Sequence, residues 1–373
     1  MHDKRVGSTW WMLIAAIVVG CLVGSLCTML VTGRLAPVLA QPVRAAARVA
    51  PESERAIVAA IAKVGPAVVN INTVFKPEEP NVPPALRQFF EEPFPRQGQA
   101  SGVIIDARGY VLTNNHVVQN ATSVKVTVAD GRTFVAKVVG ADPLSDIGVV
   151  RIEGSNLPTA ALGNSADVPI GGWLIAIGNP FGYENTATVG VLSARNRRLQ
   201  APSGVGLDQL LQTDAAINPG NSGGALVDIN GLVIGIPTAI IPYAQGIGFA
   251  IPSETARKVA AQLIETGHAI HPYLGIRYTP ITEDVQRYLK LPNRQGVLVL
   301  QVEQGSPAAQ AGIQARDIVL RLGNRTITKQ DDVAEVIRNS KVGEKLPVAV
   351  RRGGKDIELT VTIGERPAPA PQE

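Results

Sequence analysis

The chain has few cysteines and few aromatic residues for its length. Only two of its 373 residues are cysteine, Cys21 and Cys27, and both lie in one apolar segment near the start. The rest of the chain therefore has no disulfide bond and no cysteine metal site. Phe, Trp and Tyr together supply 4% of the residues. Short runs of Val and Ile, separated by Gly, Asn and Asp, recur instead between residues 64 and 251, and they favour an all-β body over βαβ units.

An excess of positive charge is also absent from most of the chain. The net charge is +4, but residues 1–48 hold five basic residues and one acidic residue, which leaves 30 of each sign in the remainder. A neutral body gives no reason to expect nucleic acid as a partner. The length suffices for about two domains.

The most informative motif surrounds Ser222, in the segment Asn-Pro-Gly-Asn-Ser-Gly-Gly-Ala-Leu at 218–226. Glycines allow positive φ angles and a close approach of backbone to ligand. A hydrolytic serine needs such surroundings, because backbone N–H groups must point at one place to bind an oxyanion. Taken alone, the segment fits a turn between two strands equally well.

Histidines are scarce, and a nucleophilic serine needs one as its base. There are four, at positions 2, 116, 268 and 271. His2 precedes the apolar segment, and His268 and His271 follow the β-rich body. His116 is therefore the only base available to Ser222.

The acid that would orient the imidazole is less sharply defined. Asp146 opens the apolar run 146–152, which is typical of a buried strand and could aim a partly desolvated carboxylate. Asp142 precedes Pro143 and is more simply a turn former. Spacing alone does not exclude Asp208 or Asp214, whose default role is solvated or structural.

The order His116, Asp146, Ser222 is the order of the chymotrypsin-type proteases. The blocks that contain these residues resemble the HtrA/Deg family of serine proteases. Further matching blocks lie at 176–182, 212–219 and 246–252, and the resemblance covers about residues 54 to 366. It implies a mainly β fold: a chymotrypsin-like protease domain of two six-stranded β-barrels, followed by an α+β PDZ domain.

The resemblance also implies roles for individual residues. Ser222 would be the nucleophile, His116 the general base and acid, and Asp146 the orienting acid, while the N–H groups of Gly220 and Ser222 would form the oxyanion hole. No metal, nucleotide or other cofactor is implied.

The specificity pocket is expected to be apolar. Ile217 and Ile240 fall near its expected walls, which favours cleavage after small or medium aliphatic residues, although both could be ordinary core. The chain departs from the family at Pro237, where asparagine is usual. Proline has no N–H to donate, which leaves the details of the neighbouring subsites open.

Two loops are expected around the protease domain. Residues 76–99 follow an expected helix at 53–63 and strand at 67–75, and their Phe89, Phe90 and Phe94 could mark contacts or tuck against the barrel. Residues 193–198 are expected to form a cationic loop. The resemblance suggests that its Arg197 senses the neighbouring domain, and a solvated turn is the simpler alternative.

The PDZ domain is expected to bind C-terminal peptides at a sheet edge. The N–H groups of the turn at Tyr273, Leu274, Gly275 and Ile276 would hold the carboxylate. Val333 and Ile337, on an expected helix at 330–339, would line the groove, or one of them would belong to the core.

Residues 10–32 carry no charge and are long enough to span a bilayer as a helix. An uncleaved anchor is favoured. The alternatives are a cleaved signal peptide, with Val38-Leu39-Ala40 before the cut, and a lipoprotein signal ending at Cys21. The expected organisation is a cytoplasmic N-terminus at 1–9, the anchor at 10–32, a linker at 33–52, the protease domain at 53–265, the PDZ domain at 266–366 and a disordered tail at 367–373.

The sequence therefore predicts a membrane-anchored serine endopeptidase whose domains lie outside the cytoplasm, on the periplasmic or extracellular side. Its substrates would be misfolded or regulatory proteins, and the resemblance implies a homotrimer. The rival interpretation is a peptide-binding module or holdase chaperone with an idle protease site.

Overall fold

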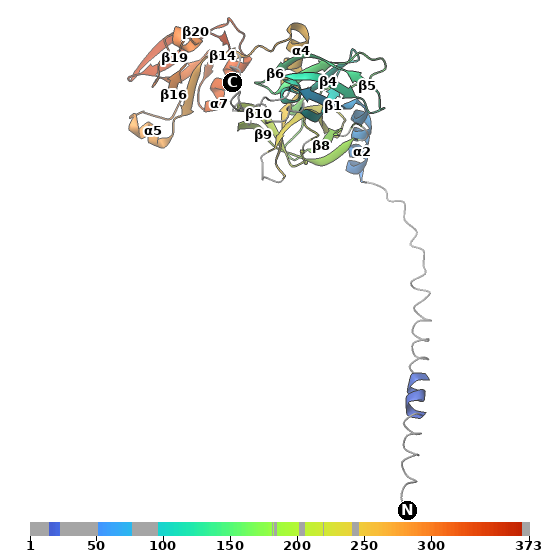
Figure 1. The fold of residues 1–373 in the computed structure, drawn as a ribbon. Helices are drawn as coiled ribbons and strands as arrows, with labels where there is room; N and C mark the ends of the chain where they lie inside the picture. The colour runs from blue at the N-terminus through green and yellow to red at the C-terminus, as the bar shows by residue number, and fades with distance from the viewer. Residues whose placement is uncertain are drawn as a thin grey trace, which may run out of the picture. The chain divides into compact units, whose positions relative to one another are not determined.

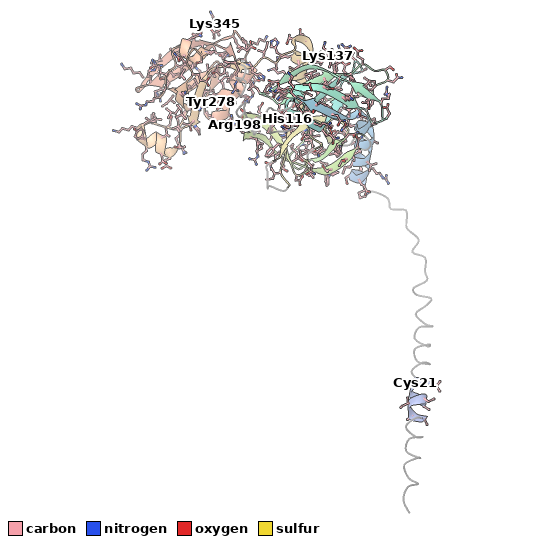
Figure 2. All side chains as sticks on the ribbon, in the orientation of Figure 1. Cys21, His116, Lys137, Arg198, Tyr278 and Lys345 are labelled. Carbon is pink, nitrogen blue, oxygen red and sulfur yellow. The ribbon has the colours of Figure 1, made fainter. Side chains whose placement is uncertain are left out.

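The computed structural model describes residues 15–22, 51–76, 96–180, 182, 185–200, 206–218, 220–240 and 246–367. The chain divides into two units, residues 1–52 and 53–373. In the first unit, residues 15–22 are helical and include the exposed Cys21 (Figure 2). Most of the expected anchor at 10–32 lies outside the described residues. Within the described part of the chain, no helix has the length and hydropathy needed to cross a membrane.

The boundary between the units falls at the start of helix α2, which begins at Glu52, one residue before the expected helix at 53–63. A curved sheet follows, and it carries His116 and Asp146. Its elements are α2 (Glu52–Val64), β1 (Val68–Phe75), β2 (Gln97–Ile104), β3 (Tyr110–Asn114), α3 (Asn115–Val118), β4 (Ala121–Thr127), β5 (Thr133–Val135), β6 (Lys137–Asp142) and β7 (Ile147–Arg151).

The first sheet has seven strands and not the six expected. Their order is β5-β4-β1-β2-β3-β7-β6, and the hydrogen-bonded strand pairs do not form a closed barrel. Its two edges, β5 and β6, are nevertheless separated in sequence by Ala136 alone. One residue spans less than 4 Å, so the sheet must curl until its edges nearly meet. The hairpin strand β5 has only three residues, which is too short a run to predict a strand from alternation.

The second sheet is a closed barrel of six strands in the order β10-β13-β12-β11-β8-β9, as expected. Its elements are β8 (Trp173–Gly178), β9 (Thr186–Gln200), β10 (Gly206–Thr213), β11 (Ala225–Asp228), β12 (Val233–Ile240) and β13 (Gly248–Pro252), followed by helix α4 (Ser253–Thr266). One buried core joins both sheets and both helices; it includes Val64, Leu112, Ile147, Ile177, Phe249 and Leu263. Figure 1 shows α2 and α4 beside the strands of the two sheets.

The remaining residues form the PDZ domain around its own core. Its elements are β14 (Pro272–Tyr273), β15 (Ile276–Pro280), α5 (Glu283–Tyr288), β16 (Val297–Val302), α6 (Pro307–Gln310), β17 (Ile318–Leu322), β18 (Arg325–Thr326), α7 (Gln330–Asn339), β19 (Lys345–Arg352), β20 (Lys355–Thr362) and β21 (Gly364–Glu365). The main sheet runs β15-β16-β17-β19-β20, so β15 is an edge strand. Helix α7 has the bounds that the sequence predicts.

Candidate active site

His116 and Asp146 are delivered by two neighbouring strands of the first sheet. His116 lies on α3, the single turn that follows β3, and Asp146 lies in the turn before β7. Asp142 builds that turn: its carboxylate accepts from the N–H groups of Leu144 and Ser145 at 3.3 and 3.1 Å. Asp146 itself adopts a φ of 56°. The turn therefore directs the Asp146 carboxylate back toward α3.

The two side chains form a close pair. His116 Nδ1 lies 3.0 Å from Asp146 Oδ1 and 2.9 Å from Oδ2, and the His116 N–H donates to Oδ1 at 3.1 Å. The Asp146 carboxylate is 11% exposed, whereas the imidazole is 51% exposed. Because Nδ1 faces the carboxylate, it carries the proton, and Nε2 is left free to accept one.

The structure separates Asp146 from the other candidate acids. The Asp208 carboxylate pairs with Arg198 on the exposed ribbon, and Asp214 accepts from the Val191 N–H at 2.6 Å. Asp142 accepts from the turn and from His271 Nε2 at 2.9 Å. Of the four carboxylates, only Asp146 contacts His116.

Burial would raise the pKa of Asp142, but hydrogen bonds from His271 and Ser145 outweigh burial and hold the pKa below its ordinary value. The carboxylate of Asp142 therefore stays charged in its turn.

A third residue, which the sequence did not predict, contacts this pair. The Thr238 hydroxyl donates to Asp146 Oδ2. Thr238 lies on β12 of the closed barrel and is 7% exposed. It therefore connects the second barrel to the acid of the first sheet. Its signal in the sequence is weak, because an isolated threonine in a strand is ordinary.

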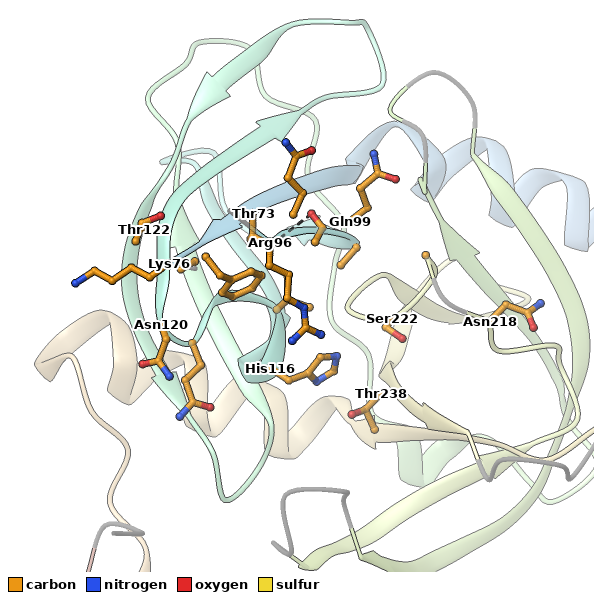
Figure 3. Close-up of a pocket in the computed structure, with 18 of the residues that line it drawn as sticks. Thr73, Lys76, Arg96, Gln99, His116, Asn120, Thr122, Asn218, Ser222 and Thr238 are labelled. Atoms are coloured by element: carbon orange, nitrogen blue, oxygen red, sulfur yellow. Dashed lines mark hydrogen bonds between the residues drawn. The ribbon is translucent and has the colours of Figure 1, made fainter. Parts of the chain in front are cut away.

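Ser222 occupies the turn between β10 and β11 and, like His116, lines a cleft of about 960 Å³. Figure 3 shows the labelled side chains of His116, Ser222 and Thr238 gathered at this cleft. Gly220 adopts a φ of 111°, and a Cβ there would stand 2.5 Å from Pro180 Cβ. Gly223 has a φ of 79°, and its Cβ would lie 2.4 Å from the Ser101 carbonyl oxygen. Both positions require glycine, which explains the glycine-rich motif.

The cleft has an apolar wall and a basic rim. Ile217 is 6% exposed and lines the cleft, while the side chain of Ile240 lies outside the described set. Lys76 and Arg96 also line the cleft, and the described lining contains no carboxylate. Figure 3 shows Arg96 reaching toward His116. Among the described residues, nothing in the cleft would attract a lysine or arginine side chain of a substrate.

Pro237 has a structural explanation. It pairs with Ala250 of β13, and its carbonyl accepts from the Gly223 N–H at 2.9 Å. The residue therefore supports the serine turn through its oxygen, and this bond does not need the missing N–H.

Arg197 is placed differently from the prediction. The stretch 193–198 is not a loop but part of strand β9, which forms a long ribbon with β10. Arg197 is exposed, and its Nε donates to Gln212 Oε1 at 2.8 Å. The ribbon also carries buried residues, such as Leu207 and Leu210 on β10, but residues 196–198 of β9 are exposed, and their charged side chains resemble those of a turn.

In the PDZ domain, the predicted turn precedes the edge strand β15. The carbonyls of Leu274 and Gly275 accept from Ala308 and Glu303 at 2.9 Å each. Within the described residues, the N–H groups of Leu274 and Gly275 donate to no partner. Ile276 begins β15. The turn thus presents backbone donors beside an open sheet edge, which is the geometry that carboxylate capture needs.

The flanking PDZ side chains differ in burial. Tyr273 donates its hydroxyl to Glu303, and burial, together with this bond, raises the pKa of Tyr273 to about 12. Val333 is fully buried in the PDZ core. Ile337 is half-buried and lines a cavity beside Ile276. Of the two helix residues, Val333 therefore belongs to the core, and Ile337 is the one at the groove.

Comparisons with known proteins agree with this arrangement. The profile of the trypsin-like peptidase domain matches residues 100–236, and that of the PDZ domain matches residues 272–363. HhoB, named as a serine protease of Synechocystis sp., is 43% identical over 85% of this chain and 80% of its own length. The chain belongs to the HtrA family of serine proteases.

Further relatives support this assignment. A DegP-like periplasmic serine endoprotease of Ectopseudomonas mendocina is 38% identical over 83% of this chain and 70% of its own. The solved structure of the HtrA-type protease AlgW with a decapeptide has a TM-score of 0.71 and 38% identity, covering 83% of this chain and 98% of that one. This HtrA-family chain is thus a mainly β serine endopeptidase with one PDZ domain.

Proposed function

We propose that this chain is an extracytoplasmic endopeptidase that uses Ser222 as nucleophile, His116 as general base and acid, and Asp146 as the orienting carboxylate. One observation supports the proposal most directly: His116 Nδ1 lies 2.9 and 3.0 Å from the two carboxylate oxygens of Asp146. His116 and Ser222 line the same cleft. With its Nδ1 proton directed at Asp146, the imidazole can accept a proton only at Nε2.

In the first step, the Ser222 oxygen attacks the scissile carbonyl carbon while its proton passes to His116. The N–H groups of Gly220 and Ser222 bind the carbonyl oxygen as it becomes an oxyanion. The C–N bond then breaks, and the leaving amine takes the proton from His116. A water molecule, deprotonated by the same imidazole, hydrolyses the acyl-enzyme.

Fluorophosphonate labelling tests this assignment. A probe with a reporter group should attach to Ser222 in the unaltered protein and to nothing in Ser222→Ala. Because HtrA-type sites can require a PDZ ligand, the reaction is run with and without C-terminal peptides. Absence of label under both conditions would favour the rival function of a peptide-binding module or holdase.

The substrate is proposed to be a protein segment with a small or medium aliphatic residue before the scissile bond. Ile217 on the cleft wall and the absence of a carboxylate from the described lining support this preference. Ile240 is retained as a second wall residue by resemblance. Cleavage-site sequencing after digestion of β-casein would show it, and cuts mainly after lysine or arginine would contradict it.

The PDZ domain is proposed to bind exposed C-termini through the N–H groups of the turn Tyr273, Leu274, Gly275 and Ile276, with Ile337 in the groove. Arg197, exposed on β9, is proposed to transmit this binding to the protease domain. Arg197→Ala should then reduce peptide-stimulated cleavage, and an unchanged stimulation would contradict the role. Cleavage of casein without any peptide would favour a general degrader over a sensor that cuts one membrane regulator.

Residues 10–32 are proposed to anchor the chain in a membrane, with the protease and PDZ domains on the periplasmic or extracellular side. The uncharged 23-residue segment and the periplasmic relatives support this. Resistance of the full chain to alkaline extraction from membranes would agree with an anchor, and release would indicate cleavage. A homotrimer is proposed from the family resemblance, and mass photometry of the protein in detergent tests it.

A further inference from the structure

Ser101 is a buried serine to which the proposed chemistry assigns no role. It lies on β2 of the first sheet and is 0% exposed. Its backbone N–H donates to the carbonyl of Ser222 at 3.0 Å. Its hydroxyl donates to the carbonyl of Gly220. One residue of the first sheet thus holds the nucleophile turn of the second barrel on both sides of Asn221.

The direction of the hydroxyl bond is fixed by a third contact. The Asn179 N–H donates to Ser101 Oγ at 2.8 Å, and a backbone N–H can only donate. The hydroxyl proton is therefore available for Gly220, whose carbonyl can only accept. If the peptide that follows Gly220 reversed, its N–H would face this site, and the Ser101 proton would be left buried without an acceptor.

The position of Ser101 is itself tightly set. The Thr113 hydroxyl donates to the Ser101 carbonyl at 2.8 Å. On the other side, Asn70 Nδ2 donates to the carbonyls of Asn179 and Pro180 at 2.9 and 3.0 Å. The hydroxyl is therefore presented by a buried polar framework rather than by a mobile side chain.

Gly220 is the residue that most needs such a restraint. Its φ of 111° is open to glycine, which also has access to many other conformations. A fixed Gly220 carbonyl restricts rotation about its Cα–C bond. The direction of its N–H, which is the proposed oxyanion donor, then depends on φ alone.

We infer that Ser101 is a positioning residue, whose hydroxyl holds the Gly220 carbonyl so that the Gly220 N–H is available to the oxyanion. This inference rests on the proposed function of Ser222 and Gly220. Ser101 does not touch the substrate, and it acts by lowering the number of conformations open to the turn. The effect is therefore on transition-state binding and not on ground-state binding.

The test compares Ser101→Ala with unaltered protein and with Ser253→Ala. Ser253 is an equally buried serine whose hydroxyl donates to the Gly163 carbonyl at 3.0 Å, away from the cleft, so its variant reports the general cost of losing such a bond. Kinetics use a fluorogenic peptide with valine before the scissile bond. A peptide trifluoromethyl ketone, which forms a tetrahedral adduct, and the matching unreactive amide report affinity with and without an oxyanion.

For Ser101→Ala we expect kcat and the fluorophosphonate labelling rate to fall on the order of 10²-fold, with KM within about twofold. The trifluoromethyl ketone should lose affinity by a similar factor, while the unreactive amide binds as before. Ser101→Cys keeps nearly the same shape but donates only a weak hydrogen bond, so its kcat should lie between those of the unaltered protein and Ser101→Ala. Ser253→Ala should keep the unaltered kcat.

The outcomes separate the two claims. If the unaltered protein is not labelled at Ser222, the proposed function fails. If it is labelled and Ser101→Ala is labelled at the same rate, with equal affinity for the ketone, the positioning role is wrong. A Ser101→Ala variant whose affinity for the amide falls as much as that for the ketone would also overturn it, because the loss would then be general distortion of the cleft.

Discussion

Replacing Thr238 by valine isolates the bond between the two barrels at the active site. Valine has nearly the shape of threonine but lacks the hydroxyl, so the change removes one hydrogen bond without leaving a cavity. Thr238 is 7% exposed, and its only described side-chain partner is Asp146 Oδ2. Asp146 would keep its bonds from the N–H and Nδ1 of His116.

The effect of Thr238→Val on the rate depends on whether the bond to Asp146 is stronger in the transition state than in the resting enzyme. A hydrogen bond to a charged group contributes about 1.5–3 kcal/mol. At 1.36 kcal/mol per tenfold, the rate could fall at most about 10²-fold. Asp146 is charged both in the resting enzyme and in the transition state, however, so most of the loss should appear in the free energy of unfolding. We expect kcat/KM to fall about tenfold through looser orientation of His116, compared with about 10⁴-fold for Asp146→Asn.

A double-mutant cycle provides the assay. The rate of peptide cleavage is measured for Thr238→Val, Asp146→Asn and the double variant, and stability is measured by urea unfolding. Because Thr238 acts on the rate through Asp146, Thr238→Val should have little further effect in the Asp146→Asn background. Thr127→Val, which removes an exposed hydroxyl 3.1 Å from that of Thr133, is the control and should leave the rate unchanged.

Two results would refute this reasoning. Unchanged rate and stability in Thr238→Val would mean that the hydroxyl does not bind Asp146 in solution. Equal rate losses from Thr238→Val in both backgrounds would mean that Thr238 acts on the substrate strand directly.

Three further predictions concern the turn, the pocket and the PDZ domain. Gly223→Ala should abolish labelling of Ser222 by a fluorophosphonate, because its Cβ would lie 2.4 Å from both the Ser101 carbonyl and the Thr113 hydroxyl; circular dichroism should show the fold retained. Ile217→Ala should enlarge the pocket and shift cleavage of a peptide library toward larger aliphatic and aromatic residues. Burial would raise the pKa of Asp332, but hydrogen bonds from the N–H groups of Thr328 and Lys329, the Thr328 hydroxyl and Arg325 outweigh burial and lower it to about 2. A lowered pKa stabilises the fold above the unfolded value of 3.8, so about 2 kcal/mol should be lost between roughly pH 4 and 2. Asp332→Asn should flatten that pH dependence in urea unfolding.

The sequence predicted the closed barrel, the PDZ helix and the candidate triad on different grounds. The runs of Val and Ile between residues 64 and 251 indicate only an all-β body, whereas the barrels and the PDZ domain with its helix are what the resemblance to the HtrA family implies. Ser222 stands out through its glycine-rich segment, His116 because it is the only histidine in the β-rich body, and Asp146 because it opens an apolar run. At Gly220 and Gly223, the positive φ and the close neighbours leave no room for another residue.

Contacts between distant segments have no such local signal. Thr238 and Ser101 are 92 and 119 residues away from the partners of their hydroxyls, and each is an ordinary strand residue in its own segment. The part of β9 that carries Arg197 was predicted to be a loop because its residues 196–198 are exposed and polar. Strand β5 was missed because its three residues are too few to show a pattern.

The placement of these bonds explains why the two barrels must pack correctly before the site can work. His116 and Asp146 belong to the first sheet, and Ser222 and Gly220 belong to the closed barrel. Each set is held by a hydroxyl from the other: Thr238 of the barrel binds Asp146, and Ser101 of the sheet binds Gly220. The two bonds point in opposite directions across the same junction, so a displacement of one barrel relative to the other would loosen both the proposed base, His116, and the proposed oxyanion donor, Gly220. If each bond acts locally, losing both hydroxyls should reduce the rate by the product of the two single fold-losses. A reduction larger than that product would mean that the barrels shift relative to one another.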